Sequence, residues 1–312
     1  MLRLFVFSIA IGAAAADLRL GIIGTDTSHV IAFTKVLNDP KNPDHVAGAR
    51  VVAAFKGGSA DLKESASRVE GYAKELREQW GVEIVADIAS LAGKVDAILL
   101  ESVDGRKHLE QAREAIKLGK PMFIDKPLAS TLADAREIAR LAKQAGVKWF
   151  STSSLRYADY AKELRGNGAE VTGAVSWGPG PFEEHHQLDL SWYAVHPIEV
   201  LFTIMGTGCE EVTRRAGATM DEVTCRWKDG RIGSVRALRP YGDFGAVAFT
   251  AKEVRQSPPK AKYSYVPMLR EIVKFFETGA VPVPNDETLE IFAFMDAAQR
   301  SKEAGGAPMK LR

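Results

Sequence analysis

Hydrophobic and polar positions alternate in two ways along residues 17–153. Short apolar runs bounded by glycine or polar residues indicate strands buried on both faces. Longer segments between them carry apolar residues at helical spacing, as at Val30, Phe33 and Leu37. We expect strands at residues 18–23, 50–55, 82–85, 95–100, 122–124 and 147–151. We expect helices at residues 28–38, 62–80, 107–118 and 131–145, and a short one near 88–91. This order predicts an α/β domain on a doubly wound parallel sheet with right-handed crossovers.

The pattern changes after residue 153. The remaining chain, residues 154–312, is expected to form a second domain that ends in helices. Its predicted strands are residues 171–177, 211–218, 222–228, 232–238 and 246–252. The segment Lys228-Asp229-Gly230-Arg231 has the composition of a hairpin turn.

The turn after the first strand is the first candidate site. Its residues are Gly24, Thr25, Asp26, Thr27, Ser28 and His29. A buried strand, a tight turn and a helix N-terminus together favour a phosphate or another anion. A dinucleotide turn of the form G-x-G-x-x-G would need a second glycine where Asp26 stands, and that carboxylate repels phosphate unless it turns away. The alternative is an ordinary strand-to-helix turn with Asp26 and Ser28 as caps.

The end of the second strand lacks the acidic residue that usually reads a ribose. It carries Lys56 and Ser59, which would suit a 2′-phosphate. The alternative is a solvated loop lysine. A further polar segment begins at Glu101, directly after the fourth expected strand.

Several segments resemble the Gfo/Idh/MocA oxidoreductases. Residues 119–127, Gly-Lys-Pro-Met-Phe-Ile-Asp-Lys-Pro, resemble the family's G-K-x-V-x-x-E-K-P segment, with Asp125 at the glutamate position. Residues 108–118 resemble the family's H-x-x-x-A-x-x-A-L helix, and residues 269–279 and 287–301 resemble its two late helices. The resemblance covers nearly the whole chain after residue 16.

The resemblance implies NAD or NADP as cofactor. The residues that would hold it are those of the turn, Gly24 to His29, together with Lys56, Glu101, Asp125 and Lys126. It also implies that the second domain is an α+β unit with an open, mainly antiparallel sheet facing the nucleotide cleft. Such sheets pair between subunits in the family, so we expect a homo-oligomer.

The resemblance further implies a substrate histidine in a D-x-x-x-H segment. His196 fits that histidine, whereas Trp192 replaces the aspartate that would orient it. The Tyr193 hydroxyl is a hypothetical substitute. Arg156, after the sixth strand, is a candidate anchor for a substrate hydroxyl or carboxylate. The alternative for His196 is a helix-start histidine bound to the backbone.

The adjacent Glu183, Glu184, His185 and His186 raise the question of a metal. Neighbouring histidines in an extended segment point apart, and we find no further ligand, so we expect no metal. We expect this loop, His186 included, to line the substrate site.

The chemistry implied is hydride transfer between nicotinamide and a sugar or polyol-like compound. Lys126 would polarise the reacting oxygen, and His196 would act as the base. The alternative for Lys126 is a surface lysine at a strand end. Two other functions stay open: a hydrolase or lyase of the same family that keeps its cofactor bound, and a degenerate member that binds a ligand without turnover.

Composition narrows the class of partner. The chain has 312 residues, 46% of them hydrophobic, and a formal net charge of +1. These values describe a globular protein with a large core, and no basic patch suggests nucleic acid.

The first 16 residues look like a secretory signal. Arg3 precedes an apolar run over residues 4–11, and Ala14-x-Ala16 fits a cleavage site. The apolar run is too short to cross a membrane. We therefore expect a periplasmic or secreted protein if the signal is used, and a cytoplasmic one otherwise. We expect Cys209 and Cys225 to be buried inert thiols, which would be able to pair after export.

Overall fold

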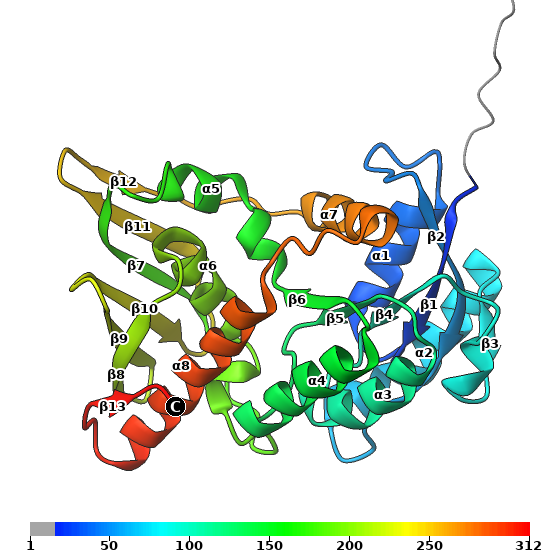
Figure 1. The fold of residues 1–312 in the computed structure, drawn as a ribbon, viewed down its shortest axis with the longest axis horizontal. Coiled ribbons are helices and arrows are strands. Elements are labelled where there is room, and N and C mark those ends of the chain that lie inside the picture. Colours follow the sequence, from blue (N-terminus) through cyan, green and yellow to red (C-terminus); the bar gives the residue numbers. More distant parts are fainter. Residues whose placement is uncertain (1–15) are drawn as a thin grey trace, which may run out of the picture.

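A computed structural model describes residues 16–312 of the chain. Its first sheet has six parallel strands in the order β3-β2-β1-β4-β5-β6 (Figure 1). The strands are β1 (Leu18–Ile23), β2 (Ala49–Phe55), β3 (Glu83–Val85), β4 (Ala97–Leu100), β5 (Met122–Asp125) and β6 (Trp149–Thr152). The order reverses between β1 and β4, which places a crevice at the carboxyl ends of those strands.

Helices cover both faces of this sheet. One face packs on α1 (Ser28–Asn38) and α2 (Lys63–Trp80), and the other on α3 (Gly105–Lys117) and α4 (Leu132–Ala145). A short 3₁₀ turn, η1 (Ala89–Leu91), precedes β4. Thr27 and Thr131 cap the first amides of α1 and α4 as their hydroxyl residue types suggest. The predicted doubly wound α/β domain is confirmed.

The second sheet has seven strands in the order β12-β11-β7-β10-β9-β8-β13. They are β7 (Val171–Pro179), β8 (Cys209–Ala216), β9 (Met220–Trp227), β10 (Ile232–Leu238), β11 (Gly245–Thr250), β12 (Val254–Gln256) and β13 (Met309–Lys310). All neighbours are antiparallel except β7 and β10. The mainly antiparallel sheet is therefore confirmed, and β12 and β13 add two edge strands that the sequence did not reveal.

Five helical segments surround this sheet. The buried helix α6 (Val195–Met205) lies on the inner face, where the Ser176 hydroxyl of β7 donates to the Pro197 carbonyl at 2.7 Å. The long helix α8 (Asn285–Glu303) packs beside β8. The shorter segments are α5 (Asp159–Arg165), η2 (Ser154–Tyr157) and η3 (Asp189–Ser191).

Helix α7 (Val266–Thr278) comes from the second half of the chain but packs in the first core. Its Leu269, Ile272 and Phe275 share a hydrophobic cluster with residues of β1, α1 and β6. The rings of Phe275 and Phe150 meet edge to face at 5.1 Å. Figure 1 shows α7 next to α1, far along the chain from it. The chain therefore crosses back over the division expected at residue 153.

The two cysteines form a disulfide that joins β8 to β9. The expectation of two inert thiols is therefore wrong. The two strands are antiparallel neighbours with Cys209 opposite Trp227, two residues from Cys225, and the Cα atoms of the two cysteines lie 6.0 Å apart, within bonding reach. No helix within residues 16–312 is long and apolar enough to cross a membrane. The predicted signal segment lies almost wholly outside the described residues.

Candidate functional site

The turn after β1 is shaped around Gly24. Gly24 adopts φ +92°, and a side chain there would overlap the backbone and hydroxyl of Ser102 at the end of β4. The amides of Gly24 and Thr25 continue the β1–β2 ladder by donating to the carbonyls of Phe55 and Lys56. Glycine is thus required by close approach of two strand ends.

The Asp26 carboxylate is directed into the protein. It accepts hydrogen bonds from the Ser65 hydroxyl at 2.6 Å and the Val103 amide at 3.1 Å, and the residue is fully buried. Burial raises the pKa of Asp26, and the hydrogen bonds from Ser65 and Val103 oppose that rise. Asp26, which replaces the second glycine of the pattern, therefore has hydrogen-bond partners inside the protein. Its carboxylate does not face the space where a phosphate would bind.

A cavity of about 490 Å³ opens at the end of β2. Its lining residues are Phe55, Gly57, Gly58, Asp87, Ile88, Ala89, Lys107, Glu110, Gln111 and Glu114. Gly57 also lies close to Gly24 and Ser102, so the cavity adjoins the turn. The side-chain oxygen of Gln111 is buried without a partner among the described residues.

Lys56 does not line this cavity. Its ammonium pairs with Glu70 at 2.7 Å on the surface, and the Ser59 hydroxyl donates to Asp104 at 2.6 Å. Of the charged residues around the cavity, three are acidic and Lys107 is basic. The expectation that Lys56 and Ser59 receive a 2′-phosphate therefore finds no support in the geometry.

The ends of β4 and β5 bring two carboxyl groups together. Glu101 is fully buried, and neither of its carboxyl oxygens has a hydrogen-bond partner among residues 16–312. Burial and the nearby Asp125 charge raise the pKa of Glu101 well above its usual value. Asp125 instead bonds the His29 ring at 2.6 Å. Although burial raises the pKa of Asp125, the charges of His29 and Lys126 outweigh it and lower that pKa to about 2.

Lys126 and His196 come from different domains, and the charge of Lys126 acts on His196. Lys126 follows β5 and is half-buried, and its ammonium makes no ion pair with any residue the structure describes. His196 stands at the start of α6, nearly buried. Burial, and next the charge of Lys126, lower the pKa of His196 well below its usual value, so its imidazole is neutral at pH 7.

Ser153 orients the imidazole of His196. The Ser153 hydroxyl lies 2.6 Å from Nδ1 of His196, while Tyr193 meets the ring edge at 5.1 Å without supplying that hydrogen bond. Trp192 instead packs on His186, with ring centroids 5.1 Å apart. Ser153 is not among the site residues predicted from the sequence. Its position directly after a buried strand, with a hydroxyl side chain, is the feature of the sequence that indicates a site residue.

Two residues expected to contact substrate are engaged elsewhere. Arg156 is buried between Glu199 at 3.3 Å and Glu287 at 2.7 Å, so it links η2 to α6 and α8. His186 is buried and bonds Asp104 of the first domain at 3.1 Å. These contacts speak against both as substrate ligands. No cluster of three metal-ligating side chains occurs in the described part of the chain.

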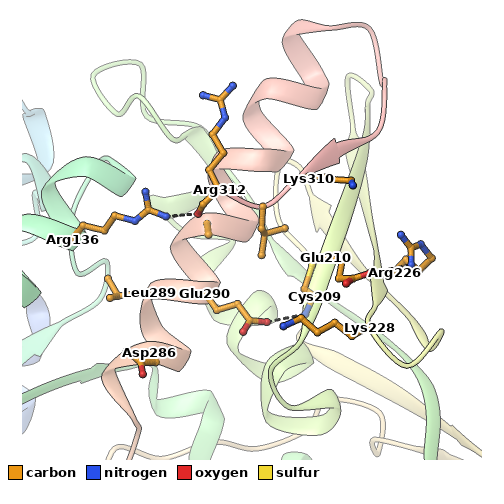
Figure 2. A pocket seen from close by; sticks show the side chains of 12 residues that line it. Arg136, Cys209, Glu210, Arg226, Lys228, Asp286, Leu289, Glu290, Lys310 and Arg312 are labelled. Carbon is orange, nitrogen blue, oxygen red and sulfur yellow. Dashed lines mark hydrogen bonds and ion pairs between the residues drawn. The ribbon is translucent and has the colours of Figure 1, made fainter.

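A second cavity of about 560 Å³ lies between α4, α8 and the β8–β9 pair (Figure 2). Its lining residues are Arg136, Cys209, Glu210, Arg226, Lys228, Asp286, Leu289, Glu290, Ala293, Lys310, Leu311 and Arg312. Glu290 accepts from the amides of Gly208 and Cys209 there, so it holds the start of β8. Neither Lys126 nor His196 lines it.

Comparison with known proteins follows the same division of the chain. Residues 18–153 match the model of the oxidoreductase family with an NAD-binding Rossmann fold, GFO_IDH_MocA. An inositol 2-dehydrogenase of Paracoccus denitrificans is 35% identical over 163 residues, 50% of this chain and 43% of that protein. A 1,5-anhydro-D-fructose reductase of Ensifer adhaerens is 37% identical over 107 residues, 33% of this chain and 31% of that protein. The chain thus spans less than half the length of these curated relatives.

Solved structures share the fold over nearly the whole chain. A probable dehydrogenase from Thermotoga maritima has a TM-score of 0.76 at 21% identity, covering 94% of this chain and 99% of the other. A myo-inositol dehydrogenase from Lactobacillus casei, in complex with NAD(H) and myo-inositol, has a TM-score of 0.73 at 17% identity, covering 95% and 97%. The six-stranded sheet and the turn after β1 have the Rossmann fold that the matching family model describes as NAD-binding. Residues 18–153 are thus similar to the Gfo/Idh/MocA oxidoreductase family, whose model they match.

Proposed function

We propose that the protein is an NAD(P)-dependent oxidoreductase that moves a hydride between nicotinamide and a sugar or polyol-like substrate. The observation that carries the proposal is that His196 of the second domain, bonded to Ser153, lies within the charge influence of Lys126, which makes no ion pair within residues 16–312. Relatives named as acting on inositol and anhydrofructose support a cyclic polyhydroxy substrate.

The residues present fit a dinucleotide. The start of α1 offers amides for the pyrophosphate, because Asp26 turns inward to Ser65 and Val103. The cavity beside Gly57 suits the adenosine half, with the Gln111 oxygen as an acceptor. Its acidic lining disfavours a 2′-phosphate, so we expect NAD rather than NADP.

When bound, the nicotinamide supplies the hydride acceptor or donor. Lys126 would hold the substrate oxygen and stabilise negative charge that develops on it. With the proton of His196 on Nδ1 and donated to Ser153, Nε2 carries a lone pair and accepts the hydroxyl proton. Because the imidazole is already neutral, this base is ready at neutral pH.

The decisive test is a spectroscopic assay of purified protein with a panel of inositols and sugars. A net change in absorbance at the wavelength of reduced nicotinamide supports the proposal. Product formation without such a change would favour a hydrolase or lyase that returns its hydride to the product. A folded protein that binds neither NAD nor NADP would contradict the proposal and favour a ligand-binding member without turnover.

We also propose that the protein is exported and self-associates. The disulfide between Cys209 and Cys225 supports an oxidising compartment, in agreement with the signal-like residues 1–16. The outer face of the second sheet carries apolar side chains from adjacent strands, among them Ile232, which is 58% exposed. Such a face supports pairing with a second copy of the chain.

A further inference from the structure

One loop of the second domain lies against the nucleotide side of the first. This loop, residues 180–193, is called the strap below. Its ends are fixed on the second domain, where the Gly180 amide donates to Leu238 and Asp189 pairs with Arg214 and Lys302. The strap is therefore a rigid projection and not a free loop.

The middle of the strap is fastened to the first domain. Nε2 of His186 lies 3.1 Å from Asp104, the residue that caps α3, and both side chains are fully buried. Two residues on, the Leu188 amide donates to the Ser130 carbonyl at 3.2 Å. Asp104 follows β4 and Ser130 follows β5, so the strap spans the loops at the carboxyl ends of both strands.

The protonation states at this fastening follow from its partners. Burial would raise the pKa of Asp104, but hydrogen bonds from His186, Arg106 and Ser59 outweigh it and hold that pKa far below its usual range. An ionised carboxylate can only accept hydrogen bonds, so Nε2 of His186 must donate. Arg106 also bonds Asp104, so the carboxylate keeps a cationic partner if His186 is removed.

A buried chain of hydrogen bonds connects this fastening to the nucleotide turn. The Ser65 hydroxyl donates to Asp26 at 2.6 Å, and the Ser59 amide donates to the Ser65 oxygen at 2.7 Å. The Ser59 hydroxyl then donates to Asp104 at 2.6 Å, next to His186. Every member is at most 4% exposed. The residue that breaks the glycine pattern, Asp26, is thus the first link of a path to the second domain.

We infer that the strap, locked to Asp104 by His186, keeps a nicotinamide dinucleotide bound between turnovers. The inference rests on the proposed function, because it needs a dinucleotide lying from the Gly24 turn along β4 toward Lys126. The strap crosses the loops after β4 and β5, where such a ligand would lie, so its release would require the strap to move and the buried hydrogen bond between His186 and Asp104 to break. Loss of that bond should act on the dissociation rate.

The test measures release of NAD from the full-length protein. Wild type is loaded with radiolabelled NAD, passed over a desalting column and followed as label exchanges with excess unlabelled NAD. We expect His186→Ala to release NAD at least tenfold faster. His185→Ala is the matched control, since His185 is partly exposed and pairs with Glu183 within the strap. It should release NAD at the wild-type rate.

The outcomes separate the inference from the function on which it rests. Equal release from wild type and His186→Ala would overturn the role of the strap while leaving the oxidoreductase in place. Failure of folded wild-type protein to bind NAD or NADP in calorimetry would overturn the proposed function itself. If His186→Ala does not fold, His186→Phe decides, because it keeps a ring beside Trp192 and removes the donor to Asp104. Release of NAD from that variant at the wild-type rate would overturn the role of the strap.

Discussion

Asp26 replaces a glycine in the nucleotide-binding turn after β1, and its contacts decide how that turn is interpreted. From sequence, its carboxylate stands where a phosphate should approach, and Asp26→Gly would tighten dinucleotide binding if it faced that phosphate. The structure places the carboxylate against Ser65 and Val103 instead. Asp26, which the motif alone suggests would weaken nucleotide binding, therefore joins the turn after β1 to α2 and to the loop after β4.

We predict that Asp26→Gly weakens the fold and does not tighten NAD binding. It leaves the Ser65 hydroxyl and the Val103 amide buried without an acceptor, which costs about 1–3 kcal/mol for each group. Urea unfolding should show this loss. Asp26→Asn keeps an acceptor and avoids ionisation in a site that raises the pKa of an acid, so it should lose less. Tighter NAD binding by the glycine variant in calorimetry would contradict this account.

The second prediction at this scale concerns Lys126 and His196. Each alanine variant should lower turnover about a hundredfold or more, with little effect on folding, because each removes a group that acts on one hydroxyl. The double variant should lose less than the product of the two effects. Cofactor binding should survive His196→Ala and weaken, if at all, in Lys126→Ala.

The pH profile gives the same assignment an independent check. The pKa of His196 is held well below its usual value, so turnover should stay flat as the pH falls through 6.5. Wild-type turnover by both Lys126→Ala and His196→Ala on a verified substrate would contradict the assignment and favour a ligand-binding protein without turnover.

At the scale of elements, the sequence predicts most of the first domain because its signals are local. Continuous apolar runs identify all six parallel strands, and hydroxyl residues and glycines identify helix ends. The edge strands β12 and β13 escape detection because they have three and two residues. Pairing with a long neighbour, and not their own pattern, makes them strands.

The candidate site was less accessible to sequence reasoning. Lys126 and His196 follow from motifs, whereas Ser153 and Asp104 act through contacts with residues far along the chain. Arg156 shows the converse error, because its place after a strand end suggests a substrate anchor, whereas its guanidinium pairs with Glu199 and Glu287. Periodicity gives the face of a helix but not the sheet it will cover, which is why α7 was grouped with the second domain.

At the scale of the whole molecule, the placement of α7 means that residues 17–153 do not form a complete folding unit. We predict that this fragment alone is unstable. Each fully buried side chain it lacks, such as Leu269 or Phe275, contributes about 1.5–3 kcal/mol, and a domain has only about 5–15 kcal/mol in total. Circular dichroism melting should show no cooperative transition.

A fused variant supplies the control. Residues 263–281 joined to the fragment by a flexible linker should restore a cooperative melt, since they return α7 to the face formed by β1, α1 and β6. Cooperative unfolding of residues 17–153 without α7 would show that the first domain completes its own core.

The same helix fixes when the nascent chain can finish folding. The sheet of the first domain has all its strands once residue 152 has been made, yet the part of one apolar face that α7 covers stays exposed until residue 278 follows. Throughout that interval the growing polypeptide displays Phe33 and Phe150 to its surroundings and offers a binding surface to chaperones. Under the export proposed above, this delay would hold the chain in the unfolded state that passage through a secretion channel requires.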